Sequence, residues 1–141
     1  MTLPLFALNH WFATAEMTNI PCQLLAYHAL KRTDDLLARN RAMISVNLDR
    51  FEAFVASRDK ALRLFRPKAG TMAIVEQRTS LTSTEFCERF LDEERVFLVP
   101  GKPLGMPDRV PRFGLGRSDF QQGLQRLDRF VRRLEESGET K

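Results

Sequence analysis

The longest regular pattern of apolar side chains lies between residues 34 and 57. Apolar residues recur there at the spacing of an α-helix for about five turns, which predicts one long amphipathic helix over residues 34–57. The apolar positions of this pattern are Leu36, Leu37, Met43, Ile44, Leu48, Phe51, Phe54 and Val55. Thr33, Asp34 and Asp35 stand at its beginning, and a polar cap followed by acidic residues is typical of a helix start.

A shorter helix is expected just before the long one, over residues 22–31. Pro21 suits the first turn of a helix, because its missing N–H has no partner there in any case. The side chains spaced for one face of this helix are Leu24, Leu25, His28 and Ala29. Residues 1–20 are expected to form an N-terminal arm, since most of this stretch shows no clear period.

Beyond the long helix the pattern changes to that of strands. Residues 62–66 alternate between apolar and basic side chains, and residues 71–75 form a second short apolar run. Pro67 and Gly70 lie between them and indicate a turn. Two strands joined this closely should pair antiparallel.

A capping box predicts the start of the next helix. Thr82 and Glu85 have the spacing at which the threonine hydroxyl and the glutamate carboxylate satisfy free amide groups reciprocally. We expect this helix to continue to about residue 94. The apolar run 96–99 then predicts a buried strand that ends at Pro100 and Gly101.

The last part of the chain predicts one more strand and one more helix. Residues 112–116 form the strand, and its glycines permit the close approach of other backbone or of a ligand. Ser118 and Gln121 suggest a second capping box. The apolar stripe of the final helix consists of Phe120, Leu124, Leu127, Val131 and Leu134.

These elements predict an α/β domain of the α+β kind: a small mixed sheet of about four strands, covered by helices and preceded by a long amphipathic helix. We expect an N-terminal arm over residues 1–20, one domain over residues 21–136, and a flexible polar tail over residues 137–141. The total of 141 residues agrees with a single domain.

Charge and composition narrow the class of function. The net charge of +4 is modest, and the basic residues are scattered and stand near acidic ones. A protein that follows a nucleic-acid backbone needs basic residues clustered on one face, so that we do not expect nucleic-acid binding. The apolar stretch from residue 3 to residue 15 is too short to cross a membrane, and no basic residue precedes it. The sequence therefore predicts a cytoplasmic protein that does not bind membranes.

The usual catalytic and metal-binding patterns are not evident. Cys22 and Cys87 are too few for a disulfide framework and lack metal-ligand spacing. Cys87 falls within a helical pattern, where a small buried side chain is the default. No motif links His10 or His28 to either cysteine. We therefore predict no catalytic residue and no metal ligand.

One residue is a candidate for substrate binding. Arg112 lies on the predicted last strand, next to the run Phe113-Gly114-Leu115-Gly116. A guanidinium group presents paired donors that match the two oxygens of a carboxylate. Taken by itself, Arg112 is weak evidence for such a site, because an exposed arginine of an edge strand is the commoner case.

Four features, in order along the chain, give Arg112 a context: a turn over residues 65–71, the helix over residues 84–94, a Val-Phe-Leu-Val-Pro-Gly run over residues 96–101, and the strand over residues 112–117. Together with the long helix before them, they resemble the small C-terminal domain of class I/II aminotransferases, which are fold-type I enzymes dependent on pyridoxal phosphate. The resemblance covers about residues 24–134. It departs from the family at Arg95, where a glycine is usual, and at Lys102 and Leu104, which replace a serine or threonine and an aromatic residue.

The resemblance implies a role and also a limit. Arg112 corresponds to the arginine that binds the α-carboxylate of an amino or keto acid substrate. The lysine that binds pyridoxal phosphate belongs to the family's large domain, and no lysine of this chain stands in a matching context. The chain would then be a truncated or stand-alone small domain that supplies the carboxylate clamp, binds no cofactor by itself and does not transaminate alone.

Two other interpretations remain open. The chain could be a non-catalytic interaction module that self-associates or docks on a separate large domain through its apolar arm, which contains Phe6, Trp11 and Phe12. It could also be an unrelated α/β domain that binds anions.

Overall fold

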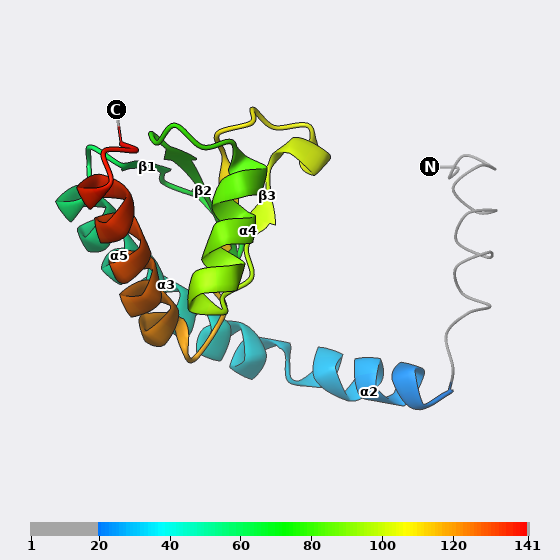
Figure 1. Ribbon diagram of the computed structural model, residues 1–141. Coiled ribbons are helices and arrows are strands. Elements are labelled where there is room, and N and C mark those ends of the chain that lie inside the picture. The colour runs from blue at the N-terminus through cyan, green and yellow to red at the C-terminus, as the bar shows by residue number, and fades with distance from the viewer. Residues whose placement is uncertain (1–19, 141) are drawn as a thin grey trace, which may run out of the picture. The chain divides into compact units, whose positions relative to one another are not determined.

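The computed structural model describes residues 20–140 (Figure 1). Its elements are α2 (Ile20–Lys31), α3 (Thr33–Ser57), β1 (Leu62–Phe65), β2 (Met72–Gln77), α4 (Ser83–Glu94), β3 (Val99–Pro100), the 3-10 helix η1 (Lys102–Leu104), β4 (Pro111–Gly114) and α5 (Phe120–Glu136). This order confirms the predicted succession of helices and strands. The predicted N-terminal arm lies outside the described residues, except for its last residue, Ile20.

The chain divides into two compact units, and the boundary falls within α3, between Arg39 and Asn40. In the first unit, α2 begins at Ile20, so that Pro21 lies in its first turn as expected. No residue of α2 is buried. In the second unit, the burial of α3 is confined to Asn47, Phe51 and Val55. The apolar pattern of the long helix therefore continues beyond the part that contributes to a core.

The sheet has four strands in the order β1-β2-β4-β3, and each neighbouring pair is antiparallel. The predicted pairing of the first two strands is confirmed, and Gly70 in the turn between them has a φ of 91°. The predicted strand over residues 96–99 is shorter than expected, since only Val99 and Pro100 pair with β4. The fold class is nevertheless the predicted one.

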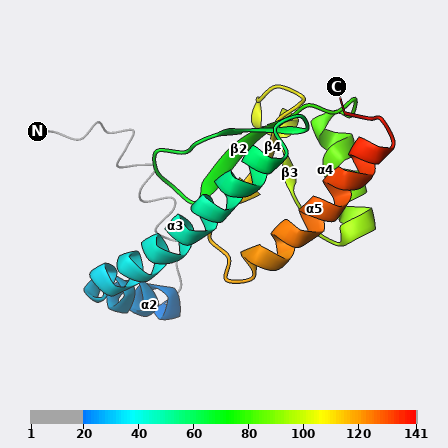
Figure 2. The same ribbon diagram turned by 90° about the vertical axis from the view of Figure 1, so that its left-hand side faces the viewer.

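The helices of the second unit cover one face of the sheet (Figure 2). Ala73 and Phe113 point from the sheet into the core, and the ring of Phe113 lies 5.0 Å from that of Phe51 on α3. α4 and α5 lie side by side on this face, where the rings of Phe86 and Phe130 are 5.1 Å apart (Figure 1). Because successive strand residues point to opposite faces, the side chains between these core positions face away from the helices.

A buried polar side chain connects α3 to the sheet. Asn47 is only 4% exposed, and its Nδ2 donates hydrogen bonds to the carbonyl oxygens of Leu115 and Arg117, both at 2.8 Å. These two carbonyls belong to the segment that leaves β4. Asn47 therefore fixes the path of the chain just after the strand that carries Arg112.

The two predicted capping boxes had different outcomes. At the start of α4, the Glu85 amide donates to Thr82 Oγ1 at 3.2 Å, and the Thr82 amide donates to Glu85 Oε2 at 2.8 Å, which confirms the first. At the start of α5 the prediction is wrong. The N-cap is Asp119, whose side chain makes no cap hydrogen bond, because Arg117 binds both of its carboxylate oxygens at 2.7 Å.

The polar residues at the end of the described chain, where the sequence predicts a flexible tail, make specific contacts up to Thr140. The carboxylate of Glu139 forms an ion pair with Arg89 at 2.8 Å, and its carbonyl accepts a hydrogen bond from the Ser80 amide at 2.7 Å. Thr140 forms an isolated bridge with Thr79. Within residues 20–140, no helix combines the length and the apolar character that crossing a membrane requires.

Candidate functional site

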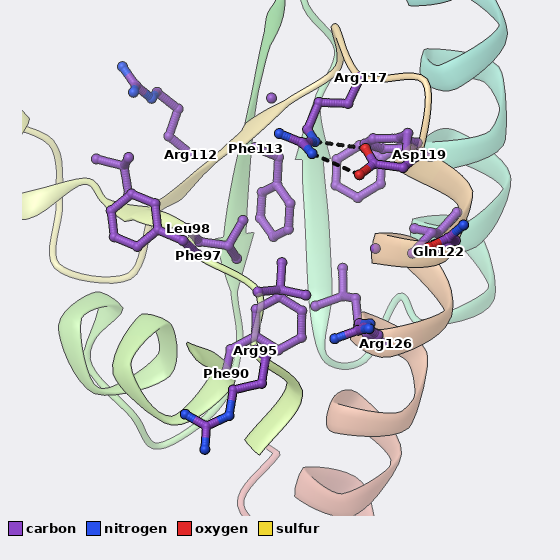
Figure 3. A pocket seen from close by; sticks show the side chains of 18 of the residues that line it. Phe90, Arg95, Phe97, Leu98, Arg112, Phe113, Arg117, Asp119, Gln122 and Arg126 are labelled. Carbon is purple, nitrogen blue, oxygen red and sulfur yellow. Dashed lines mark hydrogen bonds and ion pairs between the residues drawn. The ribbon is translucent and has the colours of Figure 1, made fainter. Parts of the chain in front are cut away.

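A cavity of about 620 Å³ opens where β4, the segment before β3 and the first turns of α5 meet (Figure 3). This volume is within the range of small-molecule sites. Much of the lining is apolar, and its residues include Phe51, Phe90, Phe113, Leu124 and Leu127. Four arginines also line the cavity: Arg95, Arg112, Arg117 and Arg126.

Two of these four arginines are already engaged. The guanidinium of Arg117 is bound to Asp119, and Arg126 Nη1 donates a hydrogen bond to the backbone carbonyl of Glu94 at 2.5 Å. By contrast, neither the side chain of Arg95 nor that of Arg112 has a hydrogen-bond or ion-pair partner within residues 20–140. These two side chains are the cations that a ligand could engage without breaking an existing interaction.

Arg112 differs from Arg95 in its burial. Arg112 is half-buried, whereas Arg95 is exposed. The other half-buried arginines of the described chain are Arg58, Arg89, Arg109 and Arg126, and each of them donates to a carboxylate or a carbonyl. A guanidinium that is partly removed from water and lacks an acceptor is unusual, because burial of a charge costs free energy unless it is paired.

The register of the sheet places Arg112 on the face away from the helices. Arg112 lies opposite Ile74 on one side and Val99 on the other, while its neighbour Phe113 points into the core. In Figure 3 the guanidinium of Arg112 points away from Phe113. This open face of the sheet is the side from which a carboxylate could approach.

The surroundings of Arg112 on this face are largely apolar. Ile74 pairs with Phe65 as well as with Arg112, so that Phe65, Ile74, Arg112 and Val99 form one row across the sheet. An acidic side chain of this face, Glu76, is paired with Arg63 at 3.8 Å. Arg112 is therefore a single available cation among apolar side chains.

Arg95 explains one departure from the aminotransferase pattern. It is the C-cap of α4, with φ 56° and ψ 37°, and it is the only non-glycine residue with a positive φ among residues 20–140. Its amide donates to the Leu91 carbonyl at 2.9 Å. A glycine is usual in the family at this position, and a left-handed cap is the conformation that glycine adopts without steric cost.

The turn after β3 also has a geometric requirement. A Cβ atom added to Gly101 would lie 2.1 Å from the carbonyl oxygen of Val110, so that no other residue fits there without movement of the backbone. Lys102, a second departure from the family, forms an ion pair with Asp108 at 2.9 Å. Leu104, the third, is exposed and does not line the cavity.

The residues of this site do not fit pyridoxal phosphate, which the aminotransferases that the sequence resembles hold through a lysine. No lysine is among the residues that line the cavity. Lys102, which follows β3, is paired with Asp108. Burial raises the pKa of the Cys87 thiol to about 12, which agrees with the structural role predicted for it. Among residues 20–140, no group of side chains is suited to hold a metal ion.

The fold is similar to solved structures of pyridoxal-phosphate (PLP)-dependent enzymes. A PLP-dependent aminotransferase from Streptococcus suis is 26% identical, with a TM-score of 0.73 over 82% of this chain and 31% of that one. The PLP-dependent cyclase OrfR is 29% identical, with a TM-score of 0.73 over 82% of this chain and 32% of that one. An aminotransferase from Staphylococcus aureus is 28% identical, with a TM-score of 0.63 over 74% of this chain and 28% of that one.

These similarities extend over most of the chain, but the chain spans less than a third of the length of each of these proteins. No protein-family profile matches the sequence. No curated protein matches it either. The comparisons therefore support an aminotransferase-like fold.

The sequence indicated Arg112 but not two other residues: Phe97, which also lines the cavity, and Asn47, which binds the segment after β4. Phe97, which lines the cavity, is 70% exposed, and the apolar run that contains it predicts a buried side chain instead. Side chains of an extended segment point alternately to opposite sides, and this rule could have indicated that Phe97 is exposed. Its neighbour Leu98 is buried, so that Phe97 must point the other way. Asn47 gave a weaker signal, as one polar residue within the apolar stripe of a long helix.

Proposed function

We propose that residues 40–140 form the small domain of a PLP-dependent, aminotransferase-like enzyme, and that Arg112 binds the carboxylate of its amino or keto acid substrate. The observation that carries this proposal is that Arg112 is half-buried on the open face of the sheet and has no acceptor within residues 20–140. Similarity to aminotransferase structures over as much as 82% of the chain supports it. The cofactor and its lysine would come from the rest of the enzyme, on the same or on a separate chain.

Binding of a simple keto acid tests this role. We expect pyruvate at millimolar concentration to shift backbone amide signals of β3 and β4 in an NMR titration. Arg112→Gln removes the charged donors, and a charge-assisted pair contributes about 1.5–3 kcal/mol, so that the affinity should fall by about 10-fold or more. Arg112→Lys keeps the charge but loses the paired donors, so that its affinity should lie between those of the other two proteins.

The matched control is Arg50→Gln. Arg50 is an exposed arginine of α3 that has no partner within residues 20–140, so that this variant changes the net charge equally without altering the cavity. It should bind pyruvate as the unaltered protein does, and thermal unfolding of all variants would show that they are folded. If pyruvate does not bind, or if Arg112→Gln binds it as tightly as Arg50→Gln does, the proposed role of Arg112 is wrong.

A second measurement addresses the cofactor. We expect no stoichiometric Schiff base when the protein alone is mixed with pyridoxal phosphate, because no lysine lines the cavity. A visible absorption band that borohydride fixes on a single lysine would show instead that the chain binds the cofactor by itself.

One observation favours a second candidate, an interaction module. Helix α2 has no buried residue, and its large exposed apolar side chains are Ile20, Leu24, Leu25, Tyr27 and Leu30. Exposed apolar surface of this kind often marks a contact with another protein. Sedimentation velocity over a wide concentration range would detect self-association, and a monomer throughout would count against it. Phe6, Trp11 and Phe12 of the predicted arm lie outside the described residues.

A further inference from the structure

We propose that the acid bound by Arg112 carries an apolar side chain, aromatic or branched, which lies in a trough above Gly114. This inference rests on the proposed function of Arg112 and adds the class of substrate. It is carried by the register of the sheet, by the exposure of the apolar side chains next to Arg112, and by the charges available on the open face.

The trough follows from the register. Gly114 pairs with Met72 on β2. On the other side of β4, Val99 is the first residue of β3 that pairs with it, and Phe97 lies two residues before Val99, toward Gly114, in a segment that does not pair with the strand. Gly114 lacks a side chain, and a Cβ atom added to it would meet no other atom within 4 Å. Gly114, Met72 and Phe97 all line the cavity. The floor of the trough is thus open backbone, and Met72 and Phe97 form its walls.

Both walls are apolar and accessible. The exposed fraction is 70% for Phe97 and 42% for Met72. Phe97 cannot turn inward, because the adjacent Leu98 occupies the core side of the segment and is only 8% exposed. Figure 3 shows the ring of Phe97 on the same side of the segment as Arg112. An apolar ligand group would therefore cover surface that is otherwise left in water.

The distance between the trough and Arg112 suits a short acid. Arg112 lies two residues before Gly114 on β4, so that both side-chain positions are on the same face. Positions two apart on a strand are separated by about 7 Å. A carboxylate on the Arg112 guanidinium would thus place a side chain of a few carbon atoms between Phe97 and Met72.

The charges on this face disfavour a second carboxylate. Arg63 is paired with Glu76 at 3.8 Å and lies over the ring of Phe65, with its Cζ 5.2 Å from the ring centroid. The guanidinium groups of Arg95 and Arg112 point apart in Figure 3. A dicarboxylate bound to Arg112 with its side chain in the trough would therefore place its second charge between Met72 and Phe97, where charge is unfavourable.

A comparison of keto acids tests this specificity. The probes are pyruvate, 4-methyl-2-oxopentanoate and 2-oxoglutarate, of which the last two have carbon chains of equal length but differ in the apolar or charged end. We expect the branched acid to bind about 10-fold tighter than 2-oxoglutarate and several-fold tighter than pyruvate, as is usual for an apolar group in a fitting pocket.

Two variants locate the preference. Gly114→Val fills the trough with a residue that strands favour, and it should bring the ratio of the dissociation constant for pyruvate to that for the branched acid close to one. Phe97→Ala removes one wall and should lower that ratio several-fold, which keeps the test decisive if Gly114→Val fails to fold. The control is Leu104→Ala, because Leu104 is an exposed apolar residue that does not line the cavity.

The outcomes separate the two proposals. If none of the three acids binds, or if Arg112→Gln does not weaken binding, the proposed function fails and this inference fails with it. If all three bind through Arg112 with equal affinity, or if 2-oxoglutarate binds most tightly, the carboxylate clamp stands and the apolar specificity is wrong. An unchanged ratio in both Gly114→Val and Phe97→Ala would also overturn the specificity.

Discussion

Replacement of Asn47 by alanine removes the donor of two hydrogen bonds that connect α3 to the end of β4. Both bonds are 2.8 Å long, and the side chain is 4% exposed, so that water cannot replace the donor without a rearrangement. Each hydrogen bond contributes about 1 kcal/mol, and the carbonyl of the buried residue Leu115 costs about 1 kcal/mol or more when it is left without a donor. We therefore expect a loss of about 2–4 kcal/mol.

The change also alters helix propensity, which a matched variant can measure. Alanine is favoured over asparagine within a helix by as much as about 0.7 kcal/mol. Asn40 is an exposed asparagine of the same helix, so that Asn40→Ala reports this contribution without the loss of a buried hydrogen bond. The difference between the two variants isolates the contacts of Asn47.

Urea denaturation monitored by circular dichroism gives the free energy of unfolding of each variant. Asn47→Ala should be less stable than Asn40→Ala by about 2–4 kcal/mol, which corresponds to a decrease of about 10 °C or more in Tm for a domain of this size. A difference below about 0.5 kcal/mol would refute the reasoning, because it would mean that the two hydrogen bonds contribute almost nothing net.

Three further predictions follow from the caps, the turns and the buried ion pairs. Arg95→Gly should raise the free energy of unfolding by about 0.5–1 kcal/mol, because it relieves a left-handed conformation and removes no side-chain hydrogen bond; an unchanged midpoint of unfolding would contradict this. Gly101→Ala should destabilise the protein by about 2 kcal/mol or more, because the new Cβ would lie 2.1 Å from the Val110 oxygen. Its control is Gly123→Ala in α5, where a Cβ has free space, so that this variant should stabilise the protein. Equal midpoints of unfolding for the two variants would refute the steric argument. Burial alone would raise the pKa of Glu94, but hydrogen bonds and ion pairs with Arg133 and Arg129 hold it below its ordinary value of 4.5. Its stabilising contribution is therefore present above pH 4.5 and is lost as the pH falls through the lower pKa of the folded state. Glu94→Gln should be less stable than the unaltered protein at neutral pH and lose less stability on acidification, as denaturation at a series of pH values would show; parallel losses in both proteins would count against it.

The parts of the fold that the sequence predicts well depend on neighbours within a few positions. The capping box of Thr82 and Glu85 needs only the backbone of one helical turn, and it formed as predicted. The turn at Gly70 and the antiparallel pairing of β1 with β2 are local in the same sense. Short loops bring these groups together at little entropic cost, so that few alternatives compete.

The predictions that failed involve competition from a group outside the motif. Asp119 has the right place for a helix cap, but the side chain of Arg117 binds its carboxylate, because an ion pair with two aligned donors is stronger than a bond to one amide. The run over residues 96–99 is apolar throughout and reads as a buried strand. Only Val99 of that run pairs with β4, and Phe97 remains exposed because the helices cover only the other face.

The sequence by itself determined the order of the elements, the fold class and the candidate Arg112, since periodicity and short motifs are properties of the chain. Only the tertiary structure decided that the side chain of Arg112 has no acceptor within residues 20–140. Arg58, Arg89 and Arg126 are also half-buried, and each of them binds an acceptor 32 to 77 positions away in the chain. Arg89 also binds Glu93, which is four positions away. Which arginine remains without an acceptor depends on which distant carboxylates and carbonyls the packing brings within hydrogen-bond distance, and no local pattern records that.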